Sequence, residues 1–280
     1  MTSHPISGYT RVYAHFAYPS EHVRTPGVFN AYFRRRGIDA VCIPVKVAPA
    51  GLAAAVAMCR SWENLAGIGV TMPHKETIAG LLDERTEGVR RAGASNVIKR
   101  LPDGRLLGGQ LDGYGFVHGL KTNGFDPAGS RALLLGAGGS ARAVAMELAL
   151  NGIAALRIAN RSRDRAEALA ADVRREFPEL AVSVADASTV QDATLIVNTT
   201  SVGMKPDDPL PVDLSGLTPQ VTVADIIMKP EVTPLLEAAR ERGCAIHPGL
   251  QMLVGQLDVT AEWLDLAPAR EAVGDMAVAR

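Results

Sequence analysis

The stretch LLLGAGGSARAVAMELA, residues 133–149, restricts the possible fold more than any other part of this sequence. A run of leucines typical of a buried strand leads directly into Gly136 and Gly138, and an amphipathic helical pattern follows. Ala141 completes the spacing G-x-G-x-x-A, in which the glycines permit a tight turn and let a pyrophosphate approach backbone amides at a helix N-terminus. A glycine-rich turn without a ligand would show the same spacing, but the order of strand and helix favours a dinucleotide site.

Short apolar runs alternate with helical patterns along most of the chain, which is typical of an α/β protein with a largely parallel sheet. A Pro-Asp-Gly turn within 101–109 predicts a hairpin. Residues 123–131 are rich in Gly, Pro, Asp and Ser and indicate a boundary between two α/β units. The expected strands are 11–17, 39–47, 66–72, 94–100, 132–136, 155–160, 181–186, 194–200 and 221–227, and the expected helices are 27–36, 50–60, 73–82, 113–122, 139–151, 162–177 and 249–266.

Composition excludes several classes of protein. The formal net charge is −1, without the basic stripe expected of a nucleic-acid-binding protein. No apolar run reaches the roughly 18 residues of a membrane span, and the N-terminus lacks the apolar core of a signal peptide. Cys42, Cys59 and Cys244 have no zinc-type spacing, so we interpret them as small buried residues in a reducing compartment. We expect a cytoplasmic protein without nucleic-acid, membrane or metal partners.

The residues that follow the second strand of the nucleotide-binding pattern distinguish the two nicotinamide cofactors. An acidic residue there binds the ribose 2′-hydroxyl of NAD, whereas an arginine accommodates the 2′-phosphate of NADP. The sequence ANRSRDRAEAL places Asn160, Arg161, Arg163 and Arg165 there, with no acid at the strand end. If Ser162 is the helix N-cap, Arg163 and Arg165 lie in the first turn, where the helix dipole disfavours cations. A bound phosphate explains these arginines better than a solvated face, so NADP is the expected cofactor.

A set of stretches, in order along nearly the whole chain, resembles the shikimate dehydrogenase family, which includes quinate dehydrogenases. The stretches are VTMPHKE (70–76), GASNVI (93–98), LDGYGF (111–116), GAGGSARAV (136–144), ANRSRDRA (159–166), NTTSVGM (198–204), PEVTPLL (230–236) and GLQMLVGQ (249–256). The resemblance implies an α/β substrate-binding domain, 1–110, and a Rossmann-type doubly wound NADP-binding domain, 111–247. The C-terminal helical region, 248–280, would return to the first domain. A monomer or homodimer acting on a small hydroxylated-ring carboxylate is implied as well.

The resemblance assigns Lys75 and Asp112 to catalysis. Oxidation of a secondary alcohol by hydride transfer needs a group that takes the hydroxyl proton, and a lysine can take this proton or return it. Without the family pattern, Lys75 would be interpreted as a solvated charge and Asp112 as the N-cap of a helix beginning at Gly113. The implied substrate contacts are Thr25, Thr71, Asn96, Gln256 and Met228. The implied cofactor contacts are Gly136, Ala137, Gly138, Gly139, Ser140, Ala141, Asn160, Arg161, Arg165, Thr199, Thr200, Ser201, Gly249 and Met252.

The sequence departs from the family pattern at the positions where the family binds its substrate. HVRTPGVFN (22–30) resembles H-S-x-S-P-x-x-H-N, whose two serines bind the substrate carboxylate. One lost hydrogen bond to a charged group costs roughly 1.5–3 kcal/mol, which is roughly ten- to a hundredfold in affinity. The replacements are Val23 and Thr25 for the serines, Phe29 for the histidine, Gly69 for an asparagine, Gln110 and Leu111 for Asn-Thr, and Met228 for a substrate-facing tyrosine.

The retained catalytic pair and the altered substrate motifs leave three interpretations open. The first is an NADP-dependent oxidoreductase that interconverts shikimate and 3-dehydroshikimate. The second is a related enzyme acting on another ring, such as quinate or an aminoshikimate, and here the arginines argue against an NAD-preferring quinate enzyme. The third is a non-catalytic NADP-binding sensor, which would need neither Lys75 nor Asp112. Arg24 is a candidate replacement contact for a carboxylate, although a lone arginine is more often solvated.

Overall fold

The computed structural model describes residues 5–21, 23–185, 190–205 and 207–268, and the chain forms two compact units with one sheet each. Unit 1 contains the residues up to Leu111 and those from Gln256 onwards, and unit 2 contains Asp112–Gly255. The turn-rich stretch 123–131 therefore lies inside unit 2. The helix that precedes this stretch belongs to unit 2 because its Phe116 and Leu120 are part of the core of that unit.

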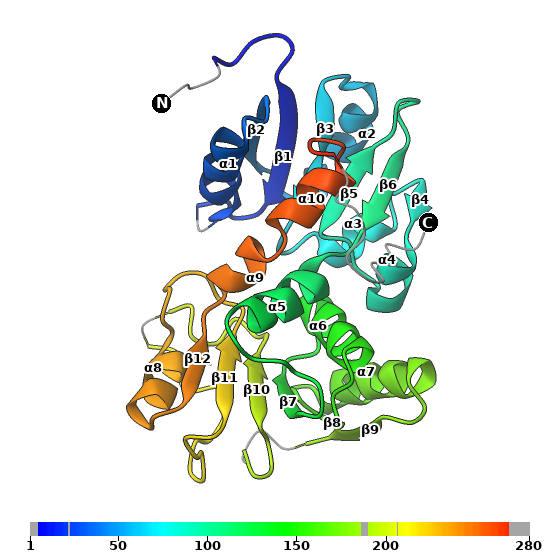
Figure 1. The fold of residues 1–280 in the computed structure, drawn as a ribbon. Helices are drawn as coiled ribbons and strands as arrows, with labels where there is room; N and C mark the ends of the chain where they lie inside the picture. The colour runs from blue at the N-terminus through cyan, green and yellow to red at the C-terminus, as the bar shows by residue number, and fades with distance from the viewer. Residues whose placement is uncertain (1–4, 22, 186–189, 206, 269–280) are drawn as a thin grey trace. The chain divides into compact units, whose positions relative to one another are not determined.

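The sheet of unit 1 has the strand order β2-β1-β3-β5-β6-β4 (Figure 1). β5 is antiparallel to both of its neighbours, and the other described pairs are parallel. The hairpin of β5 and β6 is the one that the Pro-Asp-Gly turn predicts. The elements are β1 (Arg11–Ala17), α1 (Thr25–Arg36), β2 (Ala40–Lys46), η1 (Pro49–Gly51), α2 (Leu52–Ser61), β3 (Leu65–Val70), α3 (Lys75–Ala79), β4 (Glu84–Arg85), α4 (Glu87–Ala92), β5 (Val97–Arg100), β6 (Leu106–Gly109) and α10 (Leu257–Trp263).

Helix α1 is fixed against this sheet by one aromatic contact and one side-chain amide. Tyr13 of β1 packs edge-on against Phe29 of α1, with ring centroids 5.0 Å apart. Asn30 donates from Nδ2 to the carbonyl of Cys42 at 2.9 Å and accepts from the Cys42 N–H at 2.7 Å. Because Cys42 lies on the edge strand β2, these bonds also satisfy backbone groups that have no further strand to pair with. The N-terminus of α1 is thereby held near the carboxyl end of β1.

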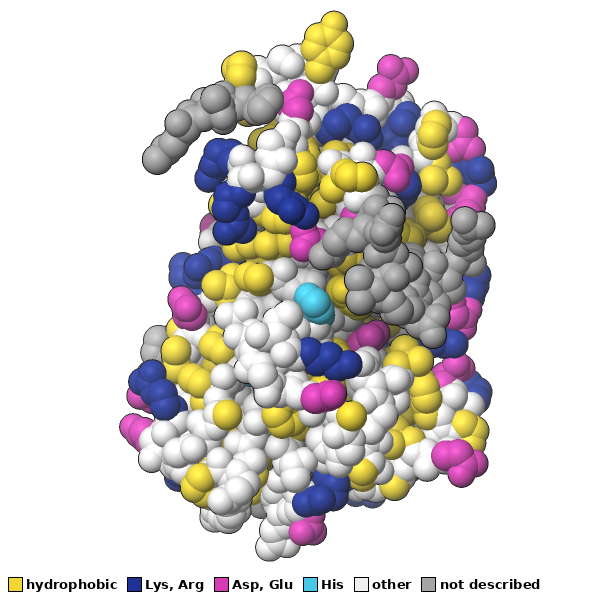
Figure 2. Space-filling model, viewed as in Figure 1, with side chains coloured by type: hydrophobic (Ala, Val, Ile, Leu, Met, Phe, Trp, Pro, Cys, Tyr) yellow, Lys and Arg dark blue, Asp and Glu magenta, His cyan; other side chains and the backbone are white. Residues whose placement is uncertain are grey.

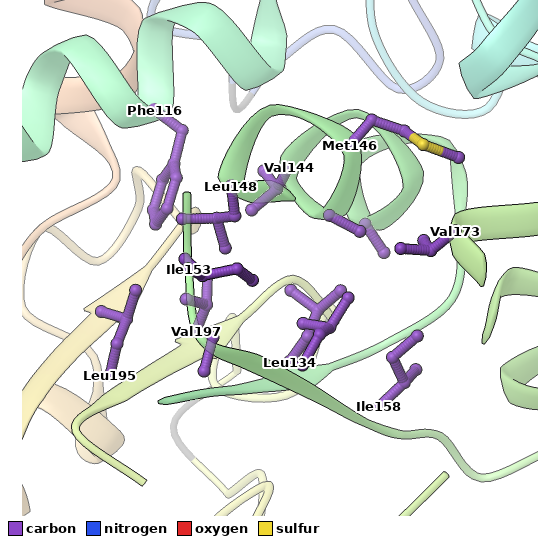
Figure 3. Close-up of a cluster of buried hydrophobic side chains, with 14 of the residues drawn as sticks. Phe116, Leu134, Val144, Met146, Leu148, Ile153, Ile158, Val173, Leu195 and Val197 are labelled. Carbon is purple, nitrogen blue, oxygen red and sulfur yellow. The ribbon is translucent and has the colours of Figure 1, made fainter. Parts of the chain in front are cut away.

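The sheet of unit 2 has the order β12-β11-β10-β7-β8-β9 and is parallel throughout, which is the Rossmann order. Leu134 and Val197 contribute to the hydrophobic cluster drawn in Figure 3, whereas Leu133 and Ile196 contribute to a second one, so both faces are buried. The elements are α5 (Asp112–Thr122), β7 (Arg131–Leu135), α6 (Gly139–Leu150), β8 (Ala155–Ala159), α7 (Arg163–Glu176), β9 (Ala181–Val184), β10 (Leu195–Asn198), β11 (Thr222–Asp225), α8 (Pro234–Glu241), β12 (Ala245–His247) and α9 (Leu250–Val254).

The C-terminal segment differs from its prediction as a helix over 249–266. It is divided into α9 and α10 at Gly255, where a Cβ atom would lie 2.3 Å from the Gly115 carbonyl oxygen of α5. This close approach of two backbones requires glycine and fixes α9 within unit 2, so only α10 belongs to unit 1. Val254, at the end of α9, is 45% exposed. The C-terminal residues after 268 lie outside the described part of the chain.

The thiols of Cys42, Cys59 and Cys244 are buried and free, as predicted. Over the described ranges, no helix has both the length and the apolar character that a membrane span needs. Exposed hydrophobic side chains are scattered among charged ones on the face shown in Figure 2. Such single exposed hydrophobic residues are ordinary for a protein surface.

Two buried titratable side chains at strand ends of unit 2 influence stability in opposite directions. His247 ends β12, packs edge-on against Phe116 and is 3% exposed, and burial lowers its pKa from 6.5 to about 4. Asp225 is the last residue of β11 and is fully buried, and burial raises its pKa from 3.8 to about 6. Between about pH 4 and 6.5 the unfolded chain binds a proton at His247 that the folded chain does not, so this group reduces stability as pH falls. At Asp225 the folded chain keeps a proton that the unfolded chain releases, so this group increases stability as pH falls through about 6.

We predict that His247→Leu removes the loss of stability that His247 causes at low pH and leaves the contribution of Asp225 unchanged. The free energy of unfolding of the variant, relative to the parent, should rise by ~3 kcal/mol as the pH is lowered from 7 to 4. Urea denaturation at a series of pH values measures this difference. Ile153→Val, a core substitution in the same unit, is the control and should shift stability equally at every pH. Parallel curves for the His247 variant and the parent would contradict the prediction.

Candidate functional site

Lys75 is the first residue of α3, after the turn that follows β3. The helix predicted over 73–82 is shorter than expected and covers only Lys75–Ala79. His74, fully buried beside it, donates from Nε2 to the Val47 carbonyl oxygen at 2.7 Å. The Lys75 carbonyl accepts the Ser95 N–H at 2.9 Å. These two bonds fix the backbone on both sides of the lysine, whose side chain is half-buried. His74 was not among the predicted site residues, although it lies between Pro73 and the lysine in the sequence.

Asn96 and Gln256 are distant in sequence and adjacent in unit 1. Asn96 Nδ2 donates to Gln256 Oε1 at 3.0 Å, and Asn96 Oδ1 accepts the Leu111 N–H at 2.7 Å. Both side chains are more than 90% buried. The Val70 N–H donates to the Asn96 carbonyl, which brings the end of β3, and therefore Thr71, beside the start of β5. The structure thus gathers Thr71, Asn96 and Gln256 at the sheet edge from which α3 and Lys75 begin.

Thr25 begins α1 at the carboxyl end of β1, and therefore at the same edge of the sheet. Its side chain is buried, and its hydroxyl makes no hydrogen bond to any described residue. The neighbouring Val23 is half-buried and Arg24 is exposed. Thr25 carries the single hydroxyl side chain in the sequence of residues 22–30.

The positions that depart from the family pattern are filled by packed side chains. A Cβ atom at Gly69 would lie 2.3 Å from His15 Nδ1 and 2.6 Å from Tyr13 Oη, so a larger residue would require these two side chains to move. Phe29 is fully buried and contacts Tyr13, Tyr32 and Phe33. Tyr13 and His15 therefore occupy the space beside β3 in which an asparagine at position 69 would lie. Tyr13 and His15 were not among the predicted site residues, because the sequence of β1 has no local pattern that indicates a site.

Two further departures lie next to the hairpin. Leu111 is buried, and its N–H is held by Asn96. Gln110 is half-buried and donates from Nε2 to the Ala94 carbonyl at 3.3 Å. Asp112 follows as the first residue of α5 and is 4% exposed. The helix begins at Asp112 itself, one residue earlier than predicted.

The glycine-rich turn of unit 2 has the predicted form. β7 leads into Gly136, whose φ of 115° is unfavourable for other residues, and a Cβ atom there would lie 2.5 Å from Thr199 Oγ1. Gly138 occupies the N-cap position of α6, and the space around it is open. Gly139, Ser140 and the fully buried Ala141 form the first turn of α6. Ala137, half-buried, completes a turn that fits a pyrophosphate at a helix N-terminus.

The arginines after β8 are exposed and available to an anion. Ser162 holds the N-cap position of α7 as predicted, but its side chain makes no capping hydrogen bond. Arg163 pairs with Glu167 at 3.4 Å, whereas Arg161 and Arg165 have no hydrogen bond or ion pair with any described residue. Asn160 Nδ2 donates to the Ser162 carbonyl at 2.9 Å and so shapes the start of the turn.

The remaining predicted cofactor contacts lie at neighbouring strand ends of unit 2. Thr199 Oγ1 donates to the Leu135 carbonyl, and Thr200 Oγ1 donates to Asn198 Oδ1, both within 2.7 Å. Ser201 is exposed. A Cβ atom at Gly249 would lie 2.4 Å from the Ile227 carbonyl oxygen, so only glycine fits. Met252, also a predicted cofactor contact, has its side chain in the core of unit 2. Met228, predicted as a substrate contact, is half-buried after β11.

Both units match known protein families. The family model described as shikimate dehydrogenase substrate binding domain matches residues 16–98, and that described as shikimate / quinate 5-dehydrogenase matches residues 120–204. The shikimate dehydrogenase (NADP(+)) of Acidiphilium cryptum is 40% identical over 265 residues, which are 94% of each chain.

Two solved structures share the fold of the chain. A shikimate dehydrogenase in complex with NADP+ has a TM-score of 0.85 at 31% identity, covering 92% of this chain and 91% of that one. The ligand-free 5-ketofructose reductase of Gluconobacter sp. strain CHM43 has a TM-score of 0.82 at 35% identity, covering 91% and 92%. With the Rossmann strand order and the glycine turn, these matches show that the chain belongs to the shikimate dehydrogenase family of NADP-dependent oxidoreductases.

Proposed function

We propose that the chain catalyses reversible hydride transfer between NADP(H) and shikimate or 3-dehydroshikimate, with Lys75 and Asp112 as the proton-transfer pair. The observation that supports this most is the fixed position of Lys75 at the edge where Thr71, Asn96 and Gln256 gather. The similarity to shikimate dehydrogenases over 94% of the chain supports the same assignment. We further propose that the enzyme acts in the cytoplasm as a monomer or homodimer.

The side chains at the site would have different roles in the reaction. Bound NADP+ supplies the hydride acceptor, and NADPH supplies the donor. Lys75 takes the hydroxyl proton as the carbonyl forms and returns it in the reverse direction. Thr71, Asn96 and Gln256 offer hydroxyl and amide groups that orient the substrate hydroxyls. Thr25 is the polar group left to meet a carboxylate.

The cofactor would be held by groups that unit 2 presents at its strand ends. The backbone of Gly136–Ala141 suits the pyrophosphate, because helix N–H groups and an open glycine lie there. Arg161 and Arg165 suit the ribose 2′-phosphate, and a guanidinium binds such a group with two parallel hydrogen bonds. Asn160, Thr199, Thr200, Ser201, Gly249 and Met252 complete the proposed set.

A second candidate substrate is an uncharged polyhydroxy ketone. Val23, Phe29 and Gly69 remove polar groups of the family pattern. Phe29 is fully buried, and Tyr13 and His15 occupy the space beside Gly69. The similarity to a 5-ketofructose reductase, at 35% identity, favours a substrate without a carboxylate. Quinate and aminoshikimate remain alternative substrates among the hydroxylated-ring carboxylates.

A substrate screen tests the proposed function. NADP+ reduction with shikimate, quinate and aminoshikimate, and NADPH oxidation with 5-ketofructose, are followed by NADPH absorbance. We expect the highest kcat/KM with shikimate. A higher kcat/KM with 5-ketofructose would favour the second candidate, and tight NADPH binding without turnover of any compound would favour a sensor and contradict the proposal.

Lys75→Ala should lower kcat by at least about a hundredfold, because general acid–base catalysis contributes roughly 10²–10⁴. NADPH affinity, measured by fluorescence titration, should be unchanged. Lys121→Ala, at the exposed end of α5, is the matched control and should leave both quantities near those of the parent. Unchanged turnover in the Lys75 variant would remove the catalytic assignment.

The double variant Arg161→Ala/Arg165→Ala should raise the KM for NADP+ by about 10- to 100-fold, since a hydrogen bond to a charged group is worth roughly 1.5–3 kcal/mol. The KM for NAD+ should change little, because NAD lacks the 2′-phosphate. Arg163→Ala, which loses only an exposed ion pair with Glu167, is the control. Equal increases for both cofactors would argue against a 2′-phosphate site.

A further inference from the structure

We propose that Asp225 is a positioning residue that holds the cofactor-binding turn 199–204 and the segment leading to Met228 in one fixed arrangement. This inference rests on the proposed function, because the roles of the turn and of Met228 belong to it. Asp225 ends β11 and has no exposed surface. Its side chain is beyond the reach of substrate and solvent, so any effect on the reaction must pass through the residues that it binds.

Towards the turn, Asp225 acts through Asn198. Asp225 Oδ2 accepts a hydrogen bond from Asn198 Nδ2 at 3.0 Å. The same amide nitrogen donates to the Val202 carbonyl at 3.1 Å, and Asn198 Oδ1 accepts from the N–H and the hydroxyl of Thr200 at 3.0 and 2.7 Å. Val202 N–H in turn donates to Thr200 Oγ1 at 3.1 Å. Once its amide is oriented by the carboxylate, Asn198 thus determines the path of the turn.

Towards the other side, the same carboxylate binds the segment after β11 and the start of α8. Oδ1 accepts the Ile227 N–H at 2.8 Å, directly before Met228. Oδ2 also accepts from Thr233 Oγ1 at 2.8 Å, and Thr233 is the N-cap residue of α8. One side chain therefore links three segments that are separate in sequence.

In this arrangement both carboxylate oxygens of Asp225 must accept hydrogen bonds. Three donors converge on Asp225, from Asn198, Ile227 and Thr233. An asparagine would place an NH₂ group where one oxygen now accepts, and that group would face either the Ile227 N–H or the donors of Asn198 and Thr233. A buried polar group that loses its partners is costly, so the substituted network is expected to rearrange.

The network also touches the glycine turn. Thr199 donates from its N–H and Oγ1 to the Leu135 carbonyl, at 2.8 and 2.6 Å, immediately before Gly136. β11, β10 and β7 are neighbours in the sheet, so the ends of three adjacent strands are joined. A shift of the turn 199–204 would therefore move Thr199 Oγ1, which lies 2.5 Å from the position that a Cβ atom at Gly136 would take.

Asp225→Asn tests the inference by NADPH binding to the full-length protein, measured by fluorescence titration without substrate. We expect the Kd for NADPH to rise at least tenfold and the KM for NADP+ to rise with it. The KM for the ring substrate should rise by a smaller factor, because Asp225 holds only the backbone directly before Met228. Val173→Ala, a core variant on α7 distant in sequence from the network, controls for loss of stability and should leave the Kd within twofold. Thr233→Ser keeps the hydroxyl and should bind as the parent does, whereas Thr233→Val should bind more weakly.

The outcomes separate this inference from the proposed function. If the parent protein does not bind NADPH, the proposed function itself fails. If the parent binds NADPH and Asp225→Asn binds it equally well, or if Val173→Ala weakens binding as much at the same loss of thermal stability, Asp225 is a structural residue only and the inference is overturned.

Discussion

Burial of both faces of the unit 2 sheet is the constraint on which the rest of that unit depends. Leu133 and Leu134 are consecutive and both fully buried, one in each hydrophobic cluster. A sheet covered on both sides has room for polar chemistry only where its strands end. The glycine turn, the 199–204 turn, Gly249 and the arginines after β8 all follow strand ends. Asp225 and Asn198 are polar residues that lie fully buried within the strands, each at the last position of its strand.

The elements that could be predicted are those with a local cause. β7, Gly136 and α6 follow one another in sequence, so strand, turn and helix are visible together, and the structure confirms them. The break between α9 and α10 was not predictable, because it results from the approach of Gly255 to Gly115 of another helix. The boundary expected at 123–131 was wrong for a similar reason: the apolar face of α5 packs on unit 2, and turn-forming residues carry no information about that.

The site residues also divide into those with a local sequence signal and those that only contacts between distant segments bring together. Arg163 and Arg165 were visible as charges at unfavourable helix positions, a property of a single helix. Lys75 was visible through the family pattern of the residues around it. Tyr13 and His15 became visible only when the parallel pairing of β1 with β3 placed His15 opposite Gly69. Asn198, Asp225 and Thr233 lie in three segments, and only the fold brings their hydrogen bonds together. Polar residues at the ends of apolar runs were the available sign, but such a sign does not specify a partner.

The packed surroundings of Gly69 bear on substrate choice more directly than the sequence departures alone. A missing asparagine could leave space for water or for a larger ligand, and either would be compatible with the family chemistry. Here Tyr13 and His15 fill that space, so the polar groups beside β3 are a phenol and an imidazole. Both can bind hydroxyl groups, and a phenol offers no charge to a carboxylate. Recognition of a carboxylate would then rest on Thr25 and on the exposed Arg24, which makes hydroxyl recognition the better-supported part of the site.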